Sequence, residues 1–124
     1  MNVFRATPVG DDWAEISAEL GRAFRMSREA AQNEESFVYV VHHDDLLGRR
    51  GPGNAMVAAG LLSAARTAAI EGSRKGWTAN VIAYDDSAEP ETVTAWAERM
   101  AEDSSGVTGE LIRVGPSHLG KALP

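Results

Sequence analysis

The chain has 124 residues, a length that suits one domain and buries roughly two thirds of its unfolded surface. Lys and Arg total 12 against 18 Asp and Glu, and the resulting net charge of −6 excludes electrostatic attraction to nucleic acid or an anionic membrane. The absence of Cys excludes disulfides and thiolate metal sites. The sequence contains no long apolar run, so no membrane-spanning segment is predicted. Because the start lacks the order of a secretion signal, we expect one cytoplasmic domain over residues 1–124.

Residues 12–32 are predicted to form an amphipathic helix. Asp12 followed by Glu15 has the spacing of a capping box, and apolar residues then recur at helical spacing. Residues 37–41 form a β-branched and aromatic run without alternation, which favours a strand covered on both faces. A polar cluster follows that run, namely His42, His43, Asp44 and Asp45.

The Ala- and Leu-rich stretch of residues 54–71 gives the strongest helix prediction, with Asn54 as its N-cap. Residues 77–84 and 110–114 are predicted as two further strands. Between them lies a third helix that begins near Pro90 and places on one apolar stripe Val93, Trp96, Ala97 and Met100. Short connections between alternating helices and strands imply parallel strands joined by right-handed crossovers. The predicted fold class is α/β, a truncated Rossmann-like αβαβαβ arrangement with three parallel strands flanked by helices.

Two stretches of the chain carry a family resemblance. The first runs from Ala59-Gly60-Leu61-Leu62 through Glu71-Gly72-Ser73-Arg74-Lys75-Gly76 into Asn80-Val81-Ile82-Ala83, and the second is Val107-Thr108-Gly109-Glu110-Leu111-Ile112. Together residues 55–83 and 105–120 resemble the C-terminal half of a short-chain dehydrogenase/reductase. The resemblance implies that the strand at 37–41 exposes the edge that pairs with a preceding strand in the family. We therefore expect something to cover that edge.

The residues on which the family's catalysis depends are replaced in this resemblance. Alignment on Ala59-Gly60-Leu61 places the family's Tyr-x-x-x-Lys pair on Asn54 and Ala58. The family's Ser falls at His42 or its neighbour His43, and its helix Asn falls near Glu19. Asn does not titrate and Ala carries no charge, so the proton transfer of the family has no donor here.

The nucleotide-binding features of the family are also missing from the resemblance. Its Pro-Gly pair falls on Tyr84-Asp85, and its Gly-rich turn, which seats a pyrophosphate on a helix N-terminus, has no counterpart. We expect no catalytic residues, no cofactor-binding residues and no cofactor.

The resemblance also implies an interface, because the helices at 12–32 and 54–71 build the family's main dimer contact. The implied interface residues are Trp13, Leu20, Phe24, Ala55, Ala59, Ser63 and Thr67. Our first hypothesis is a non-catalytic dehydrogenase-like subunit that forms a homo-oligomer, or a hetero-oligomer with a full-length short-chain dehydrogenase/reductase. Neither nucleic acid nor a membrane is an expected partner.

Two other hypotheses remain open. The chain could be one piece of a split NAD(P)-dependent oxidoreductase that a partner chain completes. It could instead be a small metal- or ligand-binding protein that uses the crevice at the strand ends. Imidazole and carboxylate are suitable ligands for divalent metals, and the candidate ligands there are His42, His43 and Asp85. The simpler interpretation of those polar residues is a solvated exit from the strand.

Overall fold

The structure is a computed structural model, and it describes residues 1–103 and 105–116. Its elements are, in chain order, β1 (Asn2–Arg5), α1 (Trp13–Gln32), β2 (Phe37–His42), α2 (His43–Leu46), α3 (Pro52–Ser73), β3 (Ala79–Tyr84), α4 (Pro90–Ala101) and β4 (Leu111–Val114). Residues 117–120, the last part of the second stretch that resembles the dehydrogenase family, lie outside the described residues. Within the described part of the chain, no helix is long and apolar enough to cross a membrane.

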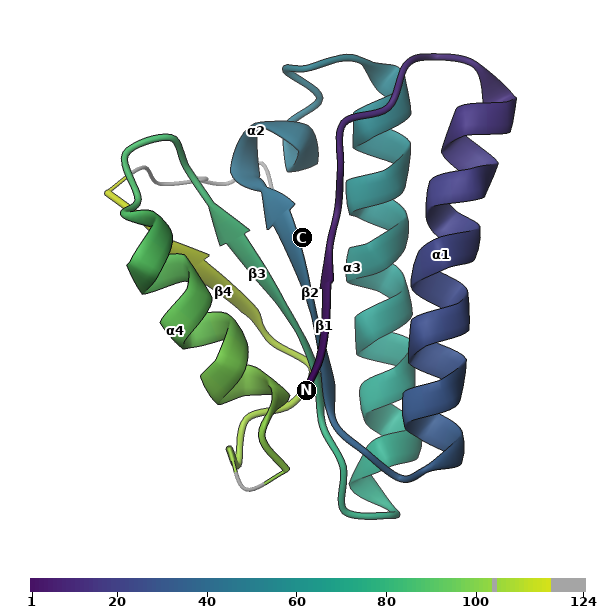
Figure 1. Cartoon of the computed structure of the whole chain (residues 1–124), viewed down its shortest axis with the longest axis vertical. Coiled ribbons are helices and arrows are strands. Elements are labelled where there is room, and N and C mark those ends of the chain that lie inside the picture. The colour runs from purple at the N-terminus through teal and green to yellow at the C-terminus, as the bar shows by residue number, and fades with distance from the viewer. Residues whose placement is uncertain (104, 117–124) are drawn as a thin grey trace.

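The four strands form one parallel sheet in the order β1-β2-β3-β4. Helices α1 and α3 cover one face of this sheet, and α4 covers the other face (Figure 1). Each strand therefore returns to the sheet through a helical crossover, as expected for parallel neighbours. The α/β, Rossmann-like fold class predicted from the sequence is confirmed.

Strand β1 was not anticipated from the sequence, which predicted three strands and an open edge on the first of them. The structure pairs β1 with β2 in the register Asn2 with Phe37 through Arg5 with Val40, so the chain itself covers that edge. A strand of four residues with two apolar side chains carries no readable periodicity. Tertiary packing identifies it instead, because Phe4 is buried and meets Tyr39 edge-on at 6.2 Å between ring centroids.

The starts of the two long helices illustrate one confirmed prediction and one wrong prediction. Asp12 caps α1, accepting a hydrogen bond from the Ala14 N–H at 3.3 Å. Helix α3 begins before the predicted Asn54, with Gly51 as its N-cap at φ 99° and Pro52 as its first residue. Glycine adopts positive φ without steric cost, and proline suits the first helical position, so this pair moves the helix start upstream.

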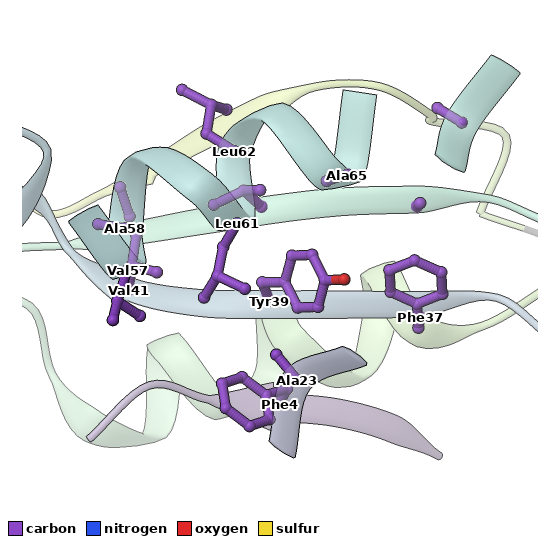
Figure 2. Close-up of a cluster of buried hydrophobic side chains, with 14 of the residues drawn as sticks. Phe4, Ala23, Phe37, Tyr39, Val41, Val57, Ala58, Leu61, Leu62 and Ala65 are labelled. Carbon is purple, nitrogen blue, oxygen red and sulfur yellow. The ribbon is translucent and has the colours of Figure 1, made fainter. Parts of the chain in front are cut away.

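The larger part of the core lies between the sheet and the pair α1 and α3. Strand β2 is buried along its whole length, and Phe37, Tyr39 and Val41 point to this side (Figure 2). Trp77 is 1% exposed and lies with its ring centroid 6.0 Å from that of Phe37. A strand buried on both faces reads as a continuous apolar run, which is why the sequence predicted it correctly.

A smaller core lies under α4 and consists of Val38, Val40, Ile82, Val93, Ala97, Met100, Ala101 and Val114. Trp96 was expected on the same apolar stripe, but it is 45% exposed. At 100° per residue, Trp96 lies 60° to one side of Val93 and Ala97 lies 40° to the other side, so 100° separates Trp96 from Ala97. The narrow stripe that faces the sheet therefore excludes it.

Candidate functional site

The carboxyl ends of the parallel strands gather polar side chains at one edge of the sheet. This is the edge at which α/β proteins generally place their ligand sites. His42 and Tyr84 end β2 and β3 in register with each other, and their rings meet at 5.1 Å between centroids. The loop after β1 and the start of α3 complete the edge.

Glu19 is buried on α1 and binds the loop that follows β1. One carboxylate oxygen, Oε2, accepts hydrogen bonds from the Thr7 N–H at 2.7 Å and the Thr7 hydroxyl at 3.0 Å. The other, Oε1, accepts from Nε and Nη2 of Arg22 at 3.0 and 2.8 Å. Burial alone would raise the pKa of Glu19, but the hydrogen bonds from Thr7 and Arg22 outweigh it and hold the pKa below its ordinary value. Glu19 is thus an ionised tie between α1 and the β1 loop.

Asn54 makes a similar tie from α3. Its Oδ1 accepts a hydrogen bond from the Val9 N–H at 2.8 Å, and its Nδ2 donates to the Arg50 carbonyl at 2.9 Å. One turn further along α3, Ala58 is 2% exposed and belongs to the core. Both polar atoms of Asn54 are therefore used within the fold.

The β1 loop lies directly on the first turn of α3. The Gly53 N–H donates to Asp11 Oδ1 at 3.1 Å. A Cβ placed on Gly53 would lie 2.1 Å from the carbonyl oxygen of Gly10, which no side chain can tolerate. Because Gly53 has no side chain, the loop after β1 can lie against the first turn of α3, and the hydrogen bond from Val9 to Asn54 holds it there.

His42 and His43 lie side by side where β2 passes into α2, with ring centroids 5.2 Å apart. They are 4% and 9% exposed. His42 Nδ1 accepts from the Asp44 N–H at 3.1 Å, and its Nε2 lies 2.8 Å from Asp86 Oδ1. His43 Nε2 lies 3.1 Å from Asp44 Oδ1, whereas its Nδ1 is buried and has no hydrogen-bond partner in the part of the chain that the structure describes.

Two arginines follow α2 and pair with its carboxylates. Arg50 makes two hydrogen bonds of 2.8 Å to Asp45, and this carboxylate raises the pKa of Arg50 further despite partial burial. Arg49 Nη1 lies 3.3 Å from Asp44 Oδ1, and its side chain is 64% exposed. Arg50 is therefore held firmly and Arg49 loosely.

The structure brings together only part of the set predicted as metal ligands. His42, His43 and Asp44 offer ligand atoms that all lie within 4.8 Å of one another. Asp85, the third predicted ligand, has other neighbours. Its Oδ1 accepts a hydrogen bond from the Ser87 N–H at 2.7 Å, and its carboxylate would contact any side chain placed on Gly115. Asp44 was identified in the sequence as part of the polar cluster but was not among the three candidate ligands, and its contacts with both imidazoles depend on α2.

A second feature is an apolar groove of about 430 Å³ between α1 and α3, which reaches Phe37, Tyr39 and Trp77 in the core. Phe24 lines it from α1, and Gly60, Ala64 and Thr67 line it from α3. Of the predicted interface residues, Trp13, Phe24, Ala59, Ser63 and Thr67 are exposed, and Leu20 and Ala55 are half-buried. The predicted set thus lies at the surface, although exposure alone does not identify an interface.

The fold is similar to that of solved oxidoreductases. It matches an oxidoreductase of the short-chain dehydrogenase/reductase family from Burkholderia thailandensis with a TM-score of 0.74 and 20% identity, over 91% of this chain and 62% of that one. The enoyl-[acyl-carrier-protein] reductase (NADH) from Aquifex aeolicus VF5 matches with a TM-score of 0.72 and 15% identity, over 91% of this chain and 59% of that one. A short-chain dehydrogenase from Mycobacterium smegmatis matches with a TM-score of 0.71 and 23% identity, over 95% of this chain and 60% of that one.

These matches concern the fold, because their sequence identities are low. The chain spans about 60% of the length of the solved proteins it matches. No protein-family model matches the chain, and no curated protein matches it by sequence.

Proposed function

We propose that this chain is a non-catalytic, dehydrogenase-like subunit that acts by association through the outer face of α1 and α3. The observation that carries the proposal is an apolar surface on these two helices. Trp13 and Phe24 on α1 are 64% and 63% exposed, and Met56 and Ile70 on α3 are 50% and 63% exposed. Large apolar side chains grouped on one surface are typical of protein interfaces.

Helical geometry places these side chains in two stripes. Eleven residues separate Trp13 from Phe24 and fourteen separate Met56 from Ile70, spacings close to three and four whole turns. Between Met56 and Ile70 the α3 stripe carries the exposed small residues Ala59, Ser63 and Thr67. Small side chains allow another helix to approach closely, and the large ones at either end provide apolar area. A second copy of the chain fits this pattern, since a twofold contact presents the same face from both partners.

The arrangement of Asn54 and Ala58 supports the absence of dehydrogenase chemistry. At the positions that the family resemblance assigns to its Tyr and Lys, the chain has an amide bonded to Val9 and Arg50 and a methyl group in the core. Neither group transfers a proton at neutral pH. A role in binding therefore accounts for the dehydrogenase-like fold better than a role in turnover.

Light scattering coupled to size exclusion tests the association. We expect the wild-type chain at micromolar concentration to have the mass of a dimer or larger assembly, and Ala59→Arg to have the mass of a monomer. Ala95→Arg is the matched control, because Ala95 is exposed on α4, on the other side of the sheet. A wild-type chain with the mass of a monomer would contradict self-association through α1 and α3. So would equal masses of the Ala59→Arg and Ala95→Arg variants.

A full-length short-chain dehydrogenase/reductase is the other partner that we propose, because this chain is similar in fold to part of such a protein over 91% of its own length. If the wild-type chain is monomeric alone and Ala59→Arg abolishes co-elution with such an enzyme, the hetero-oligomeric form of the proposal is supported. We place the chain in the cytoplasm on this proposal, as an associate of a soluble enzyme.

The split-oxidoreductase hypothesis is a second candidate, favoured by one observation. Within the described residues, β1 pairs with β2 alone, so its other edge is available to a strand from another chain. Such a partner would have to supply the nucleotide-binding half and the proton-transferring groups. A thermal shift on adding a nicotinamide nucleotide would support it, because a ligand of the native state raises stability.

A further inference from the structure

We propose that His42, His43 and Asp44 form a binding site for a divalent transition-metal ion of the zinc and cobalt class. The site is independent of the association described above and uses a different part of the molecule. It lies at the carboxyl edge of the sheet, where β2 passes into α2. Two imidazoles and a carboxylate are the ligands that such ions prefer when no thiolate is present.

The three side chains are already close enough to share an ion. Their ligand atoms all lie within 4.8 Å of one another. A tetrahedral ion with ligand bonds of about 2.0–2.2 Å holds its ligands about 3.4 Å apart. His43 Nε2 and Asp44 Oδ1 are 3.1 Å apart, and His42 Nδ1 and Asp44 Oδ2 are 3.9 Å apart. These two separations, which use different oxygens of Asp44, are within about half an ångström of the tetrahedral value, and the third pair of ligand atoms lies within 4.8 Å.

The two ring nitrogens of His43 have different surroundings. The residue is 9% exposed; its Nε2 faces Asp44, and its Nδ1 is buried without a hydrogen-bond partner among the described residues. The ion would bind Nε2, and the proton of the neutral imidazole would then be on Nδ1.

His42 has the orientation expected of a ligating imidazole. Its Nε2 lies 2.8 Å from Asp86 Oδ1, a contact in which the ring nitrogen donates and the carboxylate oxygen accepts. The lone pair is then on Nδ1, which faces Asp44. Histidines that bind metals commonly donate their second N–H to a carboxylate in this way, which orients the ring and strengthens the ligand.

Binding requires two contacts to be released, the Arg49 ion pair and the hydrogen bond from the Asp44 N–H to His42 Nδ1. Arg49 now contacts Asp44 at 3.3 Å, but its side chain is 64% exposed, and exposed ion pairs contribute little stability. Arg50 does not compete, because Asp45 holds it through two hydrogen bonds. His42 Nδ1 also gives up the Asp44 N–H, which the first turn of a short helix can expose to water. An incoming cation thus replaces the Arg49 guanidinium at the Asp44 carboxylate.

Cobalt absorption and zinc calorimetry on the chelator-treated chain test the site. We expect one ion per chain, with a visible cobalt spectrum of low-symmetry, four-coordinate character. His43→Gln is expected to weaken binding at least about tenfold, as loss of a first ligand exceeds the 10- to 100-fold cost of losing an outer partner. His118→Gln is the control, because the chain has three histidines. Arg49→Ala is expected to tighten binding severalfold by removing the competing cation.

Asp44→Asn, which keeps the side-chain shape, decides the question if His43→Gln does not fold, as judged by circular dichroism. Weaker binding in that variant with a native spectrum supports the site. Absence of zinc binding by the folded wild-type chain overturns it. So does binding that is lost in His118→Gln and retained in the folded His43→Gln or Asp44→Asn variant. None of these readouts depends on oligomeric state, so this proposal and the association proposal can fail separately.

Discussion

Asn54 accepts a hydrogen bond from the backbone N–H of Val9 at 2.8 Å, which joins the first turn of α3 to the loop after β1. The same side chain donates to the Arg50 carbonyl, so one amide holds two loops against the helix. Both polar atoms of the Asn54 side chain are therefore engaged in structural hydrogen bonds.

Asn54→Ala is expected to lower the free energy of unfolding by about 1–3 kcal/mol, because it leaves the Val9 N–H and the Arg50 carbonyl without partners. Urea denaturation followed by circular dichroism measures the change. Asn33→Ala is the control, since Asn33 is exposed at the end of α1. Equal stability of the two variants would show that the Asn54 tie contributes nothing.

Glu19 is expected to make stability dependent on acid pH. Its pKa is lowered in the folded chain, so its contribution is complete above the unfolded pKa of about 4.3 and is lost as pH falls through the lower folded value. Thermal midpoints measured from pH 7 down to pH 3 should therefore decrease less steeply in Glu19→Gln than in the wild type. Glu29→Gln, at an exposed site on the same helix, should retain the wild-type slope. If the thermal midpoint of Glu19→Gln falls with pH as steeply as that of the wild type, Glu19 is not the source of the acid dependence.

Gly72→Ala is expected to destabilise the chain by more than about 1 kcal/mol, because overpacking a filled core commonly costs about 1–3 kcal/mol. A Cβ at this position would lie 2.4 Å from the Trp77 carbonyl oxygen and 2.5 Å from its ring. Gly21→Ala is the matched control on α1, where a Cβ meets only the flexible end of Arg25 at 3.4 Å. There we expect a gain of up to about 1 kcal/mol from helix propensity. Denaturation midpoints compare the two, and a stable Gly72→Ala chain would refute the tight contact.

Nicotinamide nucleotides are expected to leave the thermal midpoint of the isolated chain unchanged. The sequence has no Gly-rich turn that would seat a pyrophosphate on a helix N-terminus, and the loop after β1 lies on the first turn of α3. Differential scanning fluorimetry at millimolar NADH and NADPH measures this. A concentration-dependent rise in the midpoint would instead favour the split-oxidoreductase hypothesis.

The elements with strong local signals were predictable from sequence. Residues 12–32 and 37–41 matched α1 and β2 closely, because a capped amphipathic helix and a fully buried strand each have a distinct pattern. Strand β1 was not predictable, since its four residues are defined by pairing with β2 rather than by periodicity.

The candidate site was predictable only in part. The two adjacent histidines were visible in the sequence, but their acidic partner depends on α2, a helix of four residues with no propensity signal of its own. The roles of Asn54 and Glu19 depend on contacts with Val9 and Thr7, residues in a loop that sequence patterns do not position. Long-range hydrogen bonds of this kind become apparent only in the folded chain.

The most direct measurement of association through α1 and α3 is the distance between spin labels on neighbouring copies. The chain has no Cys, so Thr67→Cys provides a single labelling site on the outer face of α3, and Trp96→Cys provides one on α4. We expect a Thr67 distance within about two helix diameters, roughly 20–24 Å plus the label arms, and a much longer distance from Trp96. No coupling between Thr67 labels, or a shorter distance between Trp96 labels, would contradict the proposed association surface.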